Sequence, residues 1–204
     1  MVLVAVVLVA VELVVVGNKY YYKKMIVAKN KIKTNIGEYL LYMFQIEDLI
    51  RAYNFDEKAI EESLISQYEV DNSEYNEIKK WYFGLIELMI DEKLKTKGHL
   101  SFINNKINEV MEFHQYLLQS TKYTGYQNNF KDIIPIINEL RLKQSSNLND
   151  INIILDAIYG IYLLKIKNDK ITEDTLTSVK KLSVFLNELS NKFKEYEIGK
   201  LKIE

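Results

Sequence analysis

The most concentrated group of chemically capable side chains in this sequence is Gln45, Glu47, Asp48 and Arg51, which interrupt an apolar segment. Glu47 and Arg51 are four residues apart and Asp48 and Arg51 are three apart, so the three charges can meet on one side of a helix. One interpretation is a polar site inside a helical bundle. The interpretation we favour is a structural ion pair, on or just under the surface, that fixes helix register.

Arginine is rare in this chain, because only Arg51 and Arg141 occur among 27 basic residues. A planar guanidinium with five donors is therefore expected where its geometry is needed. Arg141 follows apolar residues and Glu139, and we expect it to join the network of Glu47, Asp48 and Arg51 across helices. These four residues form the candidate polar network.

The two histidines suggest different roles. His99 follows Gly98 in a lysine-rich segment, and His99 and Lys97 form a candidate loop site in which an imidazole could act as a general base or contact an anion. A helix cap or a solvated surface position is the interpretation we favour for His99. His114 lies in line with apolar residues, which indicates a core or boundary histidine with satisfied hydrogen bonds rather than a ligand.

No cofactor or metal site is indicated. The positions three residues before the histidines hold Thr96 and Met111, so the Glu-x-x-His pairs of a di-iron bundle are missing. The sequence has no HExxH, GxGxxG, GxxxxGK[ST] or GxSxG pattern, and without cysteine it has no thiolate nucleophile or cysteine-ligated metal. We therefore expect no cofactor and no metal.

The charge balance argues against nucleic acid as a partner. The net charge is −1, so the 15 Tyr and eight Phe are not matched by the basic groove that base stacking requires. Most of these aromatic residues lie on apolar stripes and are interpreted as core. Tyr20, Tyr21, Tyr22, Tyr123 and Tyr126 remain candidates for a protein interface.

Apolar residues recur at helical spacing through most of the chain. Asn35 with Glu38, Asp56 and Thr172 are expected to cap helices, and Gly98 is expected to end one. Pro135 either follows the start of its helix or kinks it. Trp81 and Leu88 broaden the apolar stripe of their helix. The expected helices span 36–53, 57–64, 74–97, 103–117, 130–140, 150–167 and 173–193.

The fold class that follows is all-α. A chain of 204 residues can bury a sizeable core without disulfides, and short loops between helices imply antiparallel neighbours. We therefore expect residues 25–204 to form a single-domain antiparallel bundle of about six to seven helices.

Residues 1–24 differ from the rest of the chain. Residues 1–16 are almost purely apolar, but a helix of that length spans only about 24 Å of a hydrocarbon core of about 30 Å, and Glu12 lies within it. We interpret 1–24 as a non-native or mis-started extension, with the true start at Met25. The alternative is a short membrane anchor.

Five segments resemble an uncharacterised bacterial family of small all-helical proteins, classed as a domain of unknown function. The resemblance extends from Met25 to the C-terminus, and family members begin at a Met shortly before a Thr-Asn-Ile segment, as Met25 does here. It implies a helical fold and supplies no activity, cofactor or site residue. The segments are KTNIGEYLLYMFQIEDLIRA (33–52), WYFGLIELM (81–89), KGHL (97–100), IIPIINELRLK (133–143) and LDAIYGIYLLKIK (155–167).

Two functions follow as expectations. The first is a non-enzymatic cytoplasmic helical protein that acts through protein contacts, with itself as a homodimer or with another protein. The alternative is a small-ligand-binding protein or enzyme whose pocket is lined by Glu47, Asp48, Arg51, Arg141 and His99. A cavity at these groups favours the alternative, and an exposed apolar patch favours the first. A membrane is expected as a partner only if residues 1–24 are genuine.

Overall fold

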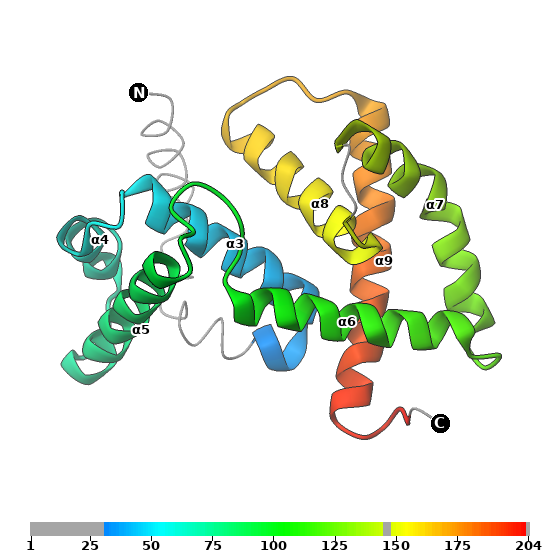
Figure 1. Cartoon of the computed structure of the whole chain (residues 1–204), viewed down its shortest axis with the longest axis horizontal. Coiled ribbons are helices and arrows are strands. Elements are labelled where there is room, and N and C mark those ends of the chain that lie inside the picture. Colours follow the sequence, from blue (N-terminus) through cyan, green and yellow to red (C-terminus); the bar gives the residue numbers. More distant parts are fainter. Residues whose placement is uncertain (1–30, 145–147, 203–204) are drawn as a thin grey trace. The chain divides into compact units, whose positions relative to one another are not determined.

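The structure, a computed structural model, describes residues 31–144 and 148–202, and over those residues it contains helices and no strand. This confirms the all-α prediction. The elements are α3 (Ile36–Ala52), α4 (Glu57–Ser63), the short 3-10 helix η2 (Ile65–Gln67), α5 (Asn72–Asp91), α6 (Ser101–Gln119), α7 (Thr124–Gln144), α8 (Asp150–Ile166) and α9 (Glu173–Glu197) (Figure 1).

The described residues divide into two compact units, one made of 42–103 and the other of 31–41 with 104–202. The boundaries fall within α3 and close to the start of α6. The expectation that 25–204 forms a single domain stays a prediction. The two units are described in turn.

In the first unit, α4, η2 and α5 pack against one another. On α5, Ile78, Tyr82, Leu85 and Met89 are buried, whereas Tyr75, which belongs to the same apolar stripe by its spacing, is only partly buried. This packing leaves the opposite side of α5 exposed to solvent.

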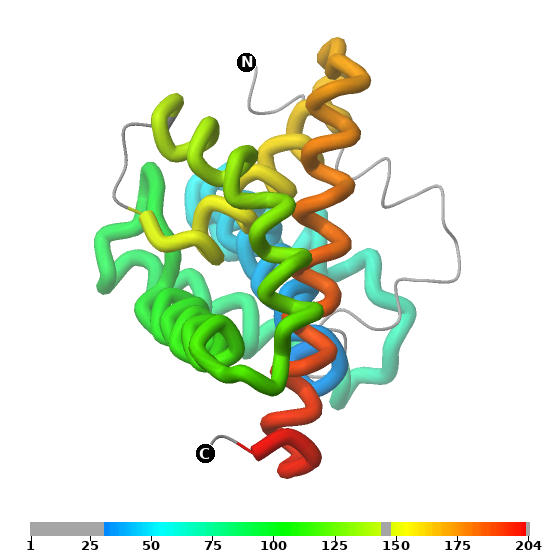
Figure 2. Tube along the Cα trace, turned by 90° about the vertical axis from the view of Figure 1, so that its right-hand side faces the viewer, coloured from blue at the N-terminus to red at the C-terminus, as the bar shows by residue number. Residues whose placement is uncertain are grey.

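In the second unit, α7, α8 and α9 contact one another pairwise, and α9 runs antiparallel to α7 (Figures 1 and 2). The α9 stripe supplies Leu182, Leu186, Leu189 and Phe193 to the core. At the N-terminal end of α3, the Gly37 amide donates to Ser190 Oγ at 3.1 Å.

Side-chain caps begin several of these helices at the predicted residues. Asn35 Oδ1 accepts from the Glu38 amide at 3.0 Å, Asp56 accepts from the Ala59 amide, and Thr172 accepts from the Thr175 amide. These bonds satisfy amides that have no partner within their own helix.

Two predicted boundaries differ most from the structure. The helix expected to end at Gly98 ends at Asp91, where Lys93 takes a positive φ of 59° and the Leu94 amide returns to the Met89 carbonyl. The helix expected to begin near 130 begins at Thr124 and continues past Pro135 to Gln144. Gly98 also has a positive φ, but it lies in the loop that follows.

Among the helices that the structure describes, none combines the length and apolar character needed to cross a bilayer. The interpretation of residues 1–24 as an extension or anchor lies outside the described residues.

Candidate functional site

Arg51 lies near the C-terminal end of α3, and its side chain binds backbone carbonyls of the loop between α5 and α6. Its Nη1 donates to Asp48 Oδ1 at 2.8 Å, its Nε donates to the Leu94 carbonyl at 3.0 Å, and its Nη2 donates to the Gly98 carbonyl. The predicted pair of Asp48 and Arg51 is therefore formed. The side chain of Arg51 is only 10% exposed, so its donors serve the fold rather than solvent.

Glu47 binds residues of the same loop. Its Oε2 lies 2.5 Å from His99 Nδ1, and its Oε1 accepts from the Leu100 amide at 2.8 Å, immediately before α6 begins. The Glu47 side chain is fully buried, and the His99 ring stacks on Phe44 with ring centroids 3.7 Å apart. Glu47 thus orients the imidazole and satisfies an amide at the start of a helix.

The pairing of a carboxylate with an imidazole is one that enzymes use to orient a general base. Here both Glu47 oxygens have partners, and the His99 side chain is 25% exposed. Lys97, the other residue of the predicted loop site, is exposed. Within the described residues, Lys97 forms no ion pair with Glu47 or any other acidic group.

Arg141 lies in a different unit from Glu47, Asp48 and Arg51, so the network expected among them stays a prediction. Arg141 is in the second unit, where its Nη2 is 2.5 Å from Asp150 Oδ1 and its Nη1 donates to Asn138 Oδ1 at 3.1 Å. The neighbouring Glu139 instead accepts from Lys143 at 2.7 Å. Arg141 therefore links the end of α7 to the start of α8.

His114 is a buried histidine whose hydrogen bonds are only half satisfied. Its Nδ1 lies 2.5 Å from the Tyr126 hydroxyl, whereas its Nε2 has no hydrogen-bond partner. Rings of Tyr126, Phe130 and Phe185 surround it edge to face. Burial lowers the pKa of His114 to about 4, although the charge of Asp150 opposes this effect.

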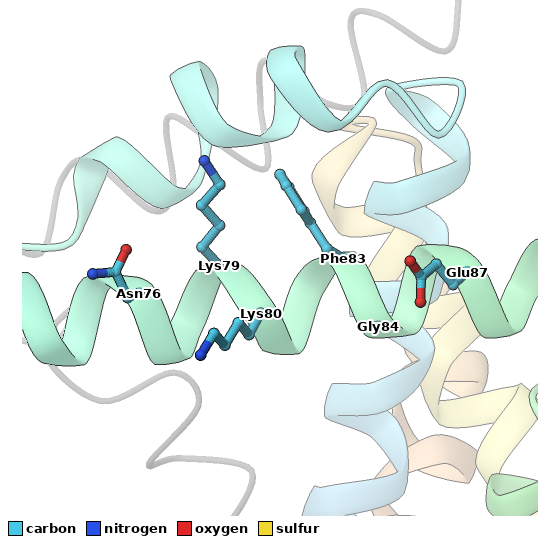
Figure 3. Close-up of a pocket in the computed structure, with 6 residues that line it drawn as sticks. All are labelled: Asn76, Lys79, Lys80, Phe83, Gly84 and Glu87. Atoms are coloured by element: carbon cyan, nitrogen blue, oxygen red, sulfur yellow. The ribbon is translucent and has the colours of Figure 1, made fainter.

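A hollow on the first unit lies along α5. None of the predicted site residues lines it. It has a volume of about 390 Å³ and is lined by Asn76, Lys79, Lys80, Phe83, Gly84 and Glu87 (Figure 3).

The inner side of this hollow is fixed by contacts with α4. Lys79 and Phe83 leave α5 on the same side (Figure 3), where Lys79 binds the Glu61 carboxylate at 2.7 Å and its Nζ lies 5.3 Å from the centre of the Phe83 ring. The Tyr75 hydroxyl donates to Glu61 as well. The hydrogen bond from Lys79, aided by the one from Tyr75, lowers the pKa of Glu61 against a smaller effect of desolvation.

The side of α5 that carries Gly84 is open to solvent, and it includes Trp81 and Leu88, which lie outside the lining of the hollow. Lys80 and Glu87 are exposed, Trp81 is partly exposed, Leu88 is 43% exposed, and a Cβ added at Gly84 would meet no atom within 4 Å. These five residues lie on one side of the helix, and we call them the α5 face. The expectation that Leu88 joins the buried stripe is therefore wrong.

Sequence reasoning missed the α5 face as a site. The available signals were a glycine in the middle of a helix and an acidic and a basic residue two turns apart. A small ligand is normally enclosed by several elements, whereas this hollow is lined by one helix. An open hollow of this kind is better suited to contact another protein than to enclose a small molecule.

Neither a search for metal-binding groups nor the comparison with known proteins identifies a function. In the described part of the chain, no three His, Cys, Asp or Glu side chains are grouped so that they could hold a metal ion. A family model described as "Domain of unknown function (DUF4924)" matches residues 25–200. No curated protein and no solved structure matches the chain significantly.

Proposed function

Because the chain belongs to the family described as "Domain of unknown function (DUF4924)", its function must be argued from its own residues, and we propose that it acts by binding another protein through the α5 face. The observation that carries this proposal is the exposure of Leu88 and Trp81 beside the open hollow over Gly84. Partly exposed aromatic and aliphatic side chains around a concavity are typical anchors in protein interfaces.

The charged residues near the end of α3 support a binding protein over an enzyme. Arg51 and Glu47 direct their polar atoms to Asp48, His99 and backbone groups of one loop. They therefore stabilise the unit that carries α5, and a reaction does not need to be invoked to explain them.

The test is the particle mass of the full-length protein in extracts of the cells that produce it naturally, measured with the Leu88→Glu variant alongside. We expect the unmodified protein to run well above its chain mass of 24.0 kDa and Leu88→Glu to run close to that mass. Leu142→Glu is the matched control, because Leu142 is 82% exposed on α7 and lies outside the α5 face. An unmodified protein at its chain mass, or equal losses in the two variants, would refute the proposal.

A small-ligand site or enzyme is the second candidate, and the specific observation in its favour is the imidazole of His99 oriented by Glu47. A ligand screen that follows the ring signals of His99, with His99→Gln as the control, tests it. Shifts that vanish in His99→Gln support this candidate, and an unchanged His99 signal across the screen counts against it.

We also propose a cytoplasmic location and a bacterial source. The absence of cysteine suits a reducing compartment, and the source follows from the resemblance to a bacterial family. Fractionation of the producing cells tests the location, and recovery of the protein in the membrane fraction would favour an anchor.

A further inference from the structure

We propose that the partner of the α5 face is a second copy of this chain, docked so that the two α5 helices lie antiparallel and cross at Gly84. This inference rests on the protein-binding function proposed above and names the partner for it.

The charges of the α5 face are arranged to complement themselves. Lys80 and Glu87 are seven residues apart, which is about two helical turns, and the midpoint between them lies next to Gly84. When two copies are related by a twofold axis at Gly84, about half a residue from this midpoint, Lys80 faces the partner's Glu87 and Glu87 faces the partner's Lys80. A single interface thus forms the same ion pair twice.

The apolar residues follow the same spacing. Trp81 and Leu88 are also seven residues apart, and their midpoint lies on the other side of Gly84. The same twofold axis therefore brings Trp81 against the partner's Leu88. Because Gly84 has no side chain and faces open space, the two helices can approach closely where they cross.

The charges needed for this contact are available. In the part of the chain that the structure describes, Lys80 and Glu87 form neither a hydrogen bond nor an ion pair with other residues, whereas Lys79 is engaged by Glu61. A parallel arrangement in register would place Lys80 against the partner's Lys80, and like charges repel. The charge pattern therefore selects the antiparallel orientation.

Exchanging the charges tests the geometry directly. In Lys80→Glu alone, and in Glu87→Lys alone, both ion pairs become repulsive, and we expect self-association to weaken about tenfold or more. When the two variants are mixed, each repulsive contact is replaced by an opposite-charge pair, so association should return. Light scattering of the purified full-length chain over a concentration series measures both effects. Residues 1–24 are the same in every sample, so association through them cannot mimic this pattern.

A second measurement uses the absence of cysteine. Gly84→Cys places a single thiol at the crossing point, and a short bifunctional maleimide should convert most of the protein to a covalent dimer. Gly125→Cys is the matched control, because a Cβ there also meets no atom within 4 Å and its position is on α7. Equal cross-linking at the two positions would overturn the proposal.

The outcomes separate this inference from the function on which it rests. A purified chain that stays monomeric, or a mixture of charge variants no heavier than either alone, overturns the second copy as partner. If the protein in its own cells still exceeds its chain mass and loses that mass in Leu88→Glu, the α5 face binds a different protein. If that excess mass is also missing, both proposals fail.

Discussion

Arg51 stabilises its unit by binding backbone carbonyls that a lysine could not reach together. We predict that Arg51→Lys lowers the free energy of unfolding by about 1–2 kcal/mol, because at least one carbonyl would lose a charged donor. Urea denaturation of the purified protein measures the loss.

Arg141→Lys is the control for this prediction. The side chain of Arg141 is 35% exposed, and among the described residues it binds the side chains of Asp150 and Asn138, so its replacement should cost less than about 1 kcal/mol. Equal stability of both variants and the unmodified protein would show that neither arginine is a structural anchor.

His114 makes stability depend on pH. Because burial lowers its pKa from 6.5 to about 4, the folded protein favours the neutral ring. The unfolded chain therefore binds more protons between these values, and the stabilisation that is complete above pH 6.5 decreases as the pH falls toward 4. We predict a loss of about 3 kcal/mol over this window, measured by urea denaturation at a series of pH values.

The variant His114→Phe combined with Tyr126→Phe removes the titrating ring together with the hydroxyl that would lose its partner. It should flatten the pH dependence between 4 and 6.5. A slope unchanged from that of the unmodified protein would assign the effect to other groups.

At the scale of residues, the sequence identified several polar groups correctly but not all of their partners. Asp48 and Arg51 are close in a helix, so helical spacing alone predicts their pair. Glu47 and His99 are separated by 52 positions, and only the folded chain brings them together. For Arg141, helical spacing could not show that Asp150 of the next helix is its partner.

At the scale of elements, helix starts were more predictable than helix ends. Starts depend on local bonds such as those of Asn35, Asp56 and Thr172, which are visible in sequence. The end of α5 depends on Lys93 in a left-handed conformation, which is costly for a lysine and is not expected from its residue type. The helix was predicted to end at Gly98 because glycine adopts a left-handed conformation easily.

Replacing glycine by alanine is expected to have opposite effects on stability at two positions. Gly37→Ala should destabilise the protein by about 1–3 kcal/mol, because its Cβ would lie 2.8 Å from Leu186 Cγ and Ser190 Oγ. Gly160→Ala in α8 meets no atom within 4 Å and should stabilise it by up to about 1 kcal/mol through helix propensity. Thermal unfolding compares the two variants, and a shift of the same sign in both would contradict the close approach of Gly37 to Leu186 and Ser190.

At the scale of the whole molecule, composition predicted the class of fold, because abundant apolar residues at helical spacing with few glycines and one proline leave little alternative to helices. It could not reveal the α5 face. An exposed Trp81 or Leu88 has the same residue type as a buried one, and only the packing of α4 and α5 decides which side faces solvent.

The single-domain expectation can be tested through Trp81, the one tryptophan of the chain, which lies in the first unit. If residues 25–204 unfold as one domain, tryptophan fluorescence and far-ultraviolet circular dichroism should change at the same urea concentration. Separate midpoints would instead show that the two units unfold independently.

The loop that joins α5 to α6 is anchored through main-chain oxygens at Leu94 and Gly98 and through the amide of Leu100. Main-chain atoms are common to all residues, so the lysine side chains at 95 and 97 can be exchanged without removing an anchor. This segment is consequently a natural place to graft short foreign peptides for display, with Arg51 and Glu47 keeping its ends in place.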